Sequence, residues 1–235
     1  MYSLFLDQSF GQGVFALFRD AECIETVHCE LKESRHPCAV WNELLTRHNL
    51  CLDAITYLVS GIGPGSYTGI RSAAATVKAI SFAKSLPIVA VSSLLLLSPI
   101  EKGSYLLAAD AGIGGVFIQE ISIADDGCDT SAPKVVSVEG FRTKAVSGAK
   151  VVVASRDWLV RKGSDGAFLA THVYCEVSAH PFVIARVAYK EFTAHRHYTA
   201  ASLPLLYLRK TQAEIDKRDA DPSVSIPTTP VTFFP

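Results

Sequence analysis

The chain has 235 residues, of which 49% are hydrophobic and 19% are charged, and this composition is typical of a globular protein with one large domain or two lobes. It has 22 lysine and arginine residues and 23 aspartate and glutamate residues, so the formal net charge is −1. This balance argues against binding of nucleic acid through a basic surface, and we expect any link to nucleic acid to be indirect.

The sequence also argues against membrane, metal and cofactor binding. The first ten residues have no basic segment of the kind that opens a signal peptide, and the longest apolar run, Leu86–Leu97, is shorter than the roughly 20 residues that span a bilayer. The six cysteines form no CxxC pair and have no zinc-ligand spacing. We therefore expect a soluble, cytoplasmic protein with no membrane contact, no metal and no cofactor.

The first hundred residues alternate between strand and helix patterns. Hydrophobic runs bounded by turn residues predict strands, and apolar residues spaced by three and four predict helices. In chain order we expect strands at Ser3–Asp7, Gly13–Phe18 and Cys23–Cys29, a helix after Pro37, a strand at Ala54–Ser60, an Ala-rich helix after a glycine loop, a strand at Pro87–Val91 and a short leucine helix capped by Ser92 or Ser93.

The second half repeats this theme more weakly. A strand at Tyr105–Asp110 ends in aspartate as Ser3–Asp7 does, and a strand from Gly115 follows it. A further strand is predicted at Lys150–Ala154 and a helix at Pro181–Phe192. We therefore expect two lobes, residues 1–101 and 102–210, followed by an extended, proline-containing tail at 211–235.

A glycine-rich loop precedes the Ala-rich helix. It lacks the lysine of a Walker loop, and its glycines do not have the spacing of a dinucleotide fingerprint. Two interpretations remain: the loop binds an anion, or it is a tight turn that positions the helix, with Ser66 or Thr68 as its cap. The residues of this loop are Gly63, Pro64, Gly65, Ser66, Thr68 and Gly69.

The helix after the loop has two non-polar faces. At 100° per residue, one face holds Ile70, Ala73, Ala74, Val77, Ile80 and Ser81, and we expect it to pack on the sheet. The opposite arc holds Ser72, Ala75, Thr76, Ala79, Phe82 and Ala83, beside a narrow stripe of Arg71 and Lys78. Small residues and a phenyl ring on an outer face suit contact with another helix. This surface could instead be covered by the tail or by the other lobe.

These stretches resemble a known family. The segment GPGSYTGIR, followed by a helix of small residues and then LPIVAVSSL, closely resembles the signature of the bacterial TsaB (YeaZ) family. Weaker matches occur in the right order. They are Leu4–Asp7, Ser34–His36, Ala109–Ala111 and Leu206–Arg209. The resemblance implies an α/β fold of two lobes, each a mixed sheet with flanking helices: the actin-like, ribonuclease-H-like fold of the ASKHA superfamily.

The resemblance also implies a function. TsaB proteins are non-catalytic partners in the synthesis of threonylcarbamoyladenosine beside the anticodon of tRNA, and they dock on a catalytic paralogue, TsaD, as a heterodimer. A small ATPase, TsaE, joins the assembly. It follows that the outer helix face and His36 are expected to bind the partner, and the same helices could support a homodimer. Asp7 and Asp110 would then mark a vestigial nucleotide site, with no catalytic residue.

Two other functions stay open from the residues. An actin-like nucleotide hydrolase or kinase would use Asp7 and Asp110, and it needs phosphate hairpins and an adenosine pocket. In the second lobe Gly112–Gly115 could serve as a phosphate hairpin, and Gly163–Gly166 is the one weak candidate for the adenosine pocket. Gly112 and Gly115 also replace the arginine and glutamate that are usual in the family. A metallopeptidase would need a ligand constellation that the histidine and cysteine spacings do not provide.

Overall fold

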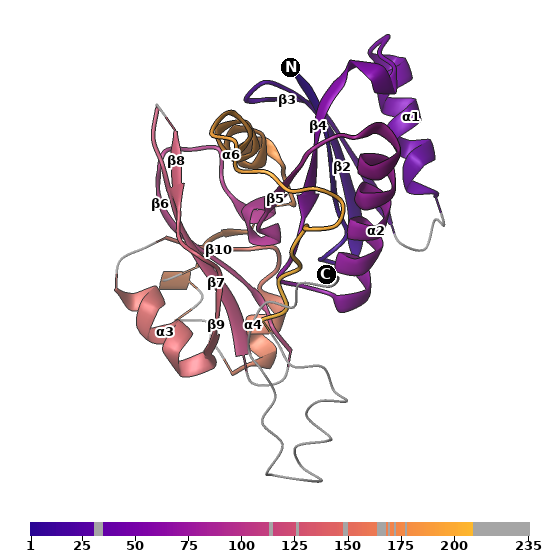
Figure 1. The fold of residues 1–235 in the computed structure, drawn as a ribbon. Coiled ribbons are helices and arrows are strands. Elements are labelled where there is room, and N and C mark those ends of the chain that lie inside the picture. Colours follow the sequence, from indigo (N-terminus) through magenta and orange to yellow (C-terminus); the bar gives the residue numbers. More distant parts are fainter. Residues whose placement is uncertain are drawn as a thin grey trace, which may run out of the picture.

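The computed structural model describes residues 1–30, 35–112, 115–125, 127–147, 150–163, 168, 170–171, 173–176 and 178–208, with the backbone alone for 173–176. Two mixed β-sheets form the framework, each with helices on its outer side (Figure 1). The tail at 211–235, the residues Ser34 and Arg209, and most of Gly163–Gly166 lie outside the described residues.

The first sheet confirms the strands and helices predicted for the first hundred residues. Its strand order is β3-β2-β1-β4-β5, in which β1, β2 and β3 form an antiparallel meander and β4 and β5 run parallel to β1. The elements are β1 (Tyr2–Asp7), β2 (Gln12–Arg19), β3 (Glu22–Glu30), α1 (Pro37–Arg47), the short 3-10 helix η2 (Leu52–Ala54), β4 (Ile55–Gly61), α2 (Tyr67–Lys84), β5 (Ile88–Val91) and the 3-10 helix η3 (Ser93–Leu97).

The second sheet repeats this topology. Its order is β11-β10-β6-β7-β8, with β9 also paired to β7, so an antiparallel hairpin is again followed by parallel strands. The elements are β6 (Gly103–Asp110), β7 (Gly115–Ile123), β8 (Cys128–Thr130), β9 (Lys134–Ser137), α3 (Val138–Val146), β10 (Lys150–Val153), α4 (Asp157–Arg161) and β11 (Val173–Glu176). The strands β8, β9 and β11 and the helices α3 and α4 were not predicted.

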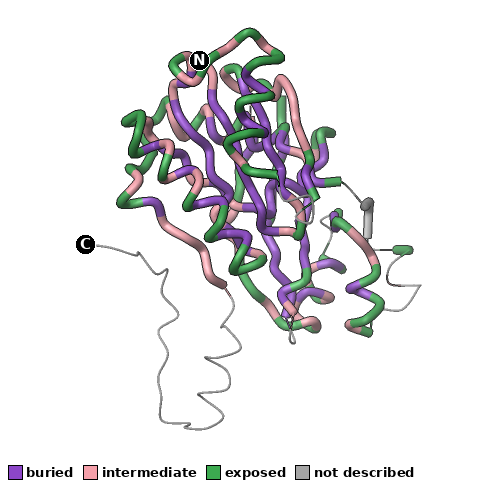
Figure 2. Tube along the Cα trace, turned by 90° about the vertical axis from the view of Figure 1, so that its right-hand side faces the viewer, coloured by how far each residue is buried: buried purple, intermediate pink, exposed green. Residues whose placement is uncertain are grey.

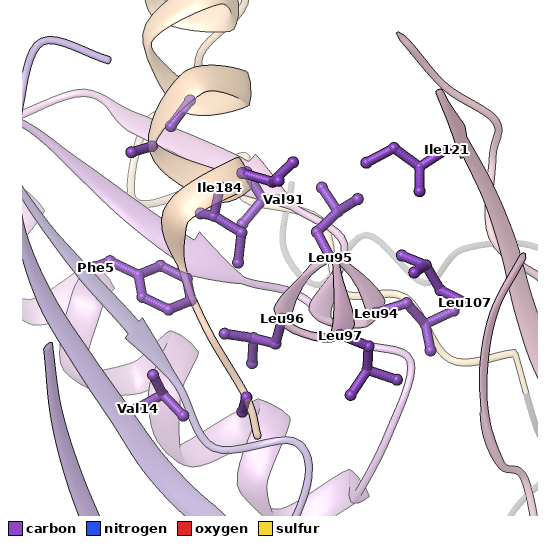
Figure 3. Close-up of a cluster of buried hydrophobic side chains, with 14 of the residues drawn as sticks. Phe5, Val14, Val91, Leu94, Leu95, Leu96, Leu97, Leu107, Ile121 and Ile184 are labelled. Atoms are coloured by element: carbon purple, nitrogen blue, oxygen red, sulfur yellow. The ribbon is translucent and has the colours of Figure 1, made fainter. Parts of the chain in front are cut away.

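A shared hydrophobic core joins the two sheets. The four leucines of η3, Leu94–Leu97, are fully buried and lie between Phe5 and Val14 of the first sheet and Leu107 and Ile121 of the second (Figure 3). Burial of a leucine side chain contributes about 1.5–3 kcal/mol. The predicted short leucine helix therefore packs against both sheets and joins the lobes, and we call Leu94–Leu97 the leucine wedge. Ser92 caps this helix by accepting a hydrogen bond from the Leu94 amide.

The C-terminal helix α6 (Phe182–Thr193) packs between the lobes. It contacts β3, β5, η3 and β8, and Phe192 stacks on Tyr57 of the first sheet at 4.2 Å between ring centroids. After α6 the chain continues along the first lobe, where the backbones of Tyr198 and Ile88 exchange two hydrogen bonds (Figure 1). Residues 182–208, which the sequence assigns to the second lobe, thus pack largely on the first. The division near residue 101 stays a prediction.

Hydrophobicity along the helices bears on the membrane question. Within the described ranges, no helix is both long enough and apolar enough to cross a bilayer.

Candidate protein-docking site

The glycine loop between β4 and α2 packs against the turn that follows β1. The Ser66 amide donates to the Ser9 carbonyl at 2.8 Å. A Cβ atom at Gly69 would lie 1.9 Å from the Gln8 carbonyl oxygen, and one at Gly65 would lie 2.6 Å from that of Ser9. Only glycine permits such an approach of two backbones. The contacts support the interpretation that the loop positions the helix.

Ser66 is the residue that caps α2. Its backbone is extended, and its hydroxyl oxygen accepts from the Gly69 amide at 3.3 Å. Such a cap satisfies one of the helix's otherwise unpaired amides and typically contributes about 1 kcal/mol. Thr68, the other predicted cap, lies inside the first turn of the helix and is exposed. The buried Gly63 and Pro64 begin the turn, and Gly63 has φ +102°.

Asp7 ends β1 beneath this loop and is 1% exposed. Its carboxylate accepts from the Ser9 amide at 2.6 Å and from the Ser93 hydroxyl, which in turn accepts from the Gly63 amide at 2.9 Å. A Cβ at Gly61 would lie 1.7 Å from an oxygen of this carboxylate. Burial raises the pKa of Asp7, and the bonds from Ser93 and Ser9 oppose that shift. The carboxylate is thus enclosed by protein groups that join β1, the loop and η3.

Asp110 ends β6 in the equivalent place, but it stays accessible. Its carboxylate accepts from the Gly112 amide at 2.7 Å and pairs with Lys162 at 3.0 Å, while 35% of its side chain is exposed. Lys162, just after α4, also donates to the Gly112 carbonyl. Ile113 and Gly114, the centre of the predicted second phosphate hairpin, lie outside the described residues.

The helix α2 has the two faces that the sequence predicts. The inner face is buried apart from Ile80, which is half-buried, and it packs on β1 and β4. On the outer face Arg71, Ser72, Ala75, Ala79 and Phe82 are exposed, and Phe82 is 83% exposed. Thr76 and Lys78 flank them and are half-buried. Figure 2, which turns the right-hand side of Figure 1 toward the viewer, shows exposed residues on the outer helices and the buried strands behind them.

The structure brings most of the predicted partner-binding residues together, because seven of the eight lie on α2. We call the exposed set Arg71, Ser72, Ala75, Ala79 and Phe82 the α2 face. His36 is separate: it is the exposed N-cap of α1, and its Nδ1 accepts from the Cys38 amide at 3.3 Å. Where the structure describes the chain, no group of three or more His, Cys, Asp or Glu side chains could hold a metal ion.

Three residues that matter here were not singled out by sequence reasoning. Ser93 was noted as a cap, but it binds Asp7. Lys162 gave no signal in the sequence. Tyr207 was noted only as part of the Leu206–Arg209 match, and its ring packs on Tyr67 at 4.6 Å between centroids, beside Arg71.

The duplicated sheets, each beginning with a hairpin whose first strand ends in aspartate, define a protein of the two-lobed actin-like fold. The family model described as TsaD, tRNA N6-adenosine threonylcarbamoyltransferase, matches residues 34–156, just over half of the chain. The chain therefore belongs to this family, and the two-lobed fold that the resemblance implies is confirmed.

Solved structures agree with the fold. A crystal structure of an uncharacterized protein with similarity to peptidase YEAZ from Pseudomonas aeruginosa is 18% identical with a TM-score of 0.72, over 88% of this chain and 99% of that one. YeaZ from Pseudomonas aeruginosa is also 18% identical, with a TM-score of 0.68, over 85% of this chain and 95% of that one. No curated protein sequence matches this chain.

Proposed function

We propose that this protein is a non-catalytic subunit for threonylcarbamoyl transfer to tRNA, and that it docks through the α2 face on a TsaD enzyme. The observation that carries the proposal is the exposed, small and apolar surface of α2 on a chain of this family. Alanines at 75 and 79 allow a second helix to approach closely, since the distance between packed helices is set by the side chains at the contact.

Phe82 gives this surface an anchor. A phenyl ring that is 83% exposed gains on the order of 1.5–3 kcal/mol when a partner buries it. Arg71 and Lys78 border the alanines, so the partner helix should combine small residues with acceptors for these cations. A second copy of the chain could use the same face when the partner is absent, and the small ATPase TsaE would join the assembled pair.

The burial of Asp7 supports a non-catalytic role. A carboxylate that helps to hold a metal-nucleotide must face the ligand, whereas that of Asp7 faces Ser9, Ser93 and the backbone of Gly61. Asp110 is paired with Lys162. The net charge of −1 likewise fits a subunit that supports a tRNA enzyme rather than one that binds tRNA by itself.

The test is co-elution of the full chain with TsaD from the same organism in size-exclusion chromatography. We expect a complex with the wild type and none with Ala79→Arg, because a guanidinium would stand where the helices meet. Ala194→Arg is the matched control, since Ala194 is an exposed alanine at the end of α6. A wild type that never co-elutes with TsaD, with TsaE and nucleotide present, would contradict the proposal.

Circular dichroism separates docking from folding. Ala79→Arg should melt within a few degrees of the wild type, because Ala79 is exposed. Unfolding of this variant would mean that the residue belongs to the core. If the wild type forms no complex with TsaD, nucleotide binding by the isolated chain becomes the function to measure.

A further inference from the structure

The segment that follows α6 ends beside the beginning of α2. Leu203 is buried among the core residues beneath α1 and α2, and Leu205 packs against the same cluster. The Leu206 amide then donates to the carbonyl of Ile62 in the glycine loop at 2.8 Å. In Figure 1 this segment is the orange coil that crosses the first lobe toward α2.

The glycine loop is therefore held from two sides. The turn at Gln8 and Ser9 packs against Gly65 and Gly69, and the Leu206 carbonyl lies so close to Gly63 that a Cβ there would be 2.7 Å from its oxygen. Because α2 begins at the end of this loop, the position of the C-terminal segment and the position of the helix are tied together.

Tyr207 carries this connection to the α2 face itself. Its hydroxyl accepts from Nε of Arg71 at 3.2 Å, and the hydroxyl of Tyr67 accepts from another nitrogen of the same guanidinium. The guanidinium carbon lies 4.0 Å from the ring centroid of Tyr67 and 5.9 Å from that of Tyr207. The two rings and the two hydrogen bonds hold the orientation of a long side chain that is otherwise flexible.

Arg71 shares a stripe with the central residues of the surface. Residues at i, i+4 and i+11 lie along one side of a helix, and this spacing aligns Arg71 with Ala75 and Phe82. A side chain that is ordered before binding loses less freedom when a partner arrives, so it contributes more to affinity. Arginine and tyrosine are also among the residues that most often dominate binding at interfaces.

We propose that Tyr207 is a positioning residue of the α2 face, which orders Arg71 so that the surface is preformed when the partner helix docks. This inference rests on the proposed function. It extends the docking site from one helix to a composite of α2 and the C-terminal segment, in which Tyr207 is 136 positions from Arg71 in the sequence.

The experiment compares Tyr207→Phe, Arg71→Lys and the double variant, all in the full chain, by calorimetric titration with TsaD. Tyr207→Phe keeps the ring and removes the hydroxyl, and we expect it to weaken binding about three- to tenfold, as befits loss of one hydrogen bond to a charged group at a partly exposed site. The double variant should bind no more weakly than the weaker single variant, because the two residues act as one unit.

A second measurement needs no partner. The Nε–H resonance of Arg71 should be protected from solvent exchange in the wild type and lose that protection in Tyr207→Phe, while the melting temperature stays within about a degree. Tyr198→Phe, which alters an exposed tyrosine of the same segment, should match the wild type in both assays.

The outcomes separate the two proposals. Wild-type affinity in Tyr207→Phe, additive losses in the double variant, or an unchanged Arg71 resonance would each overturn the role of Tyr207 while Ala79→Arg still abolishes the complex. Wild-type binding by Ala79→Arg would instead overturn docking through the α2 face.

Discussion

The two lobes begin with the same hairpin and use its aspartate differently. Asp7 and Asp110 each end a first strand, and each accepts a hydrogen bond from the amide two residues later, at 2.6 and 2.7 Å. Only Asp7 is enclosed, by Ser93 and by the glycine loop. The comparison indicates that one turn can serve as a support for a helix in one lobe and remain a surface turn in the other.

The difference arises in the connection after the parallel strand. In the first lobe β4 leads into glycines that let the backbone reach Asp7, and an 18-residue helix follows. In the second lobe β10 leads into the exposed Ala154, and the five-residue helix α4 follows. Lys162, at the end of that helix, supplies the partner for Asp110 that Ser93 supplies for Asp7.

Removing the close backbone approach should have the largest effect. In Gly69→Ala the new methyl group would lie 1.9 Å from the Gln8 carbonyl oxygen. The oxygen is a backbone atom and the position of the methyl carbon is set by the backbone of residue 69, so neither can move away by rotation of a side chain. We expect a loss of about 3 kcal/mol in the free energy of unfolding, measured by urea denaturation.

Gly115→Ala is the control in the second lobe. Its methyl would lie 3.1 Å from the side chain of Val135, which is 44% exposed and can move, so a loss under about 1 kcal/mol is expected. Equal losses would contradict the comparison.

Removing the partner of each aspartate should have a smaller effect. Ser93→Ala leaves the Gly63 amide without this hydrogen bond and removes one of the two that the buried Asp7 carboxylate accepts, so that only the bond from the Ser9 amide is left, and we expect a loss of about 2 kcal/mol. Lys162→Met keeps the aliphatic stem and removes an ion pair to a carboxylate that is 35% exposed, so about 1 kcal/mol or less should be lost. Urea denaturation measures the free energy of unfolding of both variants. A loss for Lys162→Met as large as that for Ser93→Ala would contradict the comparison, because both aspartates would then be equally important to stability.

The smallest effect concerns pH. Because burial raises the pKa of Asp7, the folded chain keeps this proton at pH values where the unfolded chain, with a pKa of about 3.9, has lost it. Stability from this group is complete below about pH 3.9 and is lost as the pH rises through the raised pKa. The free energy of unfolding of the wild type minus that of Asp7→Asn should therefore fall as the pH rises above about 4. A difference that rises over this range would contradict the enclosure of the carboxylate.

Much of the first lobe could be predicted from local sequence. Ile70, Ala73 and Val77 recur at helical spacing and are buried, alanines favour the helix between them, and Ser66 is a typical N-cap. The aspartates at the ends of β1 and β6 predicted the duplication. The exposed side of α2 followed from the same periodicity, because a helix that packs on a sheet leaves its opposite face outward.

The remaining features depend on contacts between distant residues. The enclosure of Asp7 by Ser93 joins residues 86 positions apart, and the pairing of Arg71 with Tyr207 spans 136 positions. Neither contact leaves a periodic signal. The strands β8 and β9 have three and four residues and α4 has five, so each is too short for its pattern to stand out from a loop. The register of the second sheet could not be predicted either, because the patterns of its short strands do not stand out from those of loops.

The leucine wedge at η3 has a mechanical consequence. Two-lobed proteins that close around a ligand do so by bending at a hinge, which requires that the lobes can separate without exposing their cores. Here any separation would bring Leu94–Leu97 into water, and α6 would be pulled from β5 or from β8. The two lobes should accordingly move as one stiff body. A rotation imposed on the second lobe would then change the orientation of α2 by the same amount.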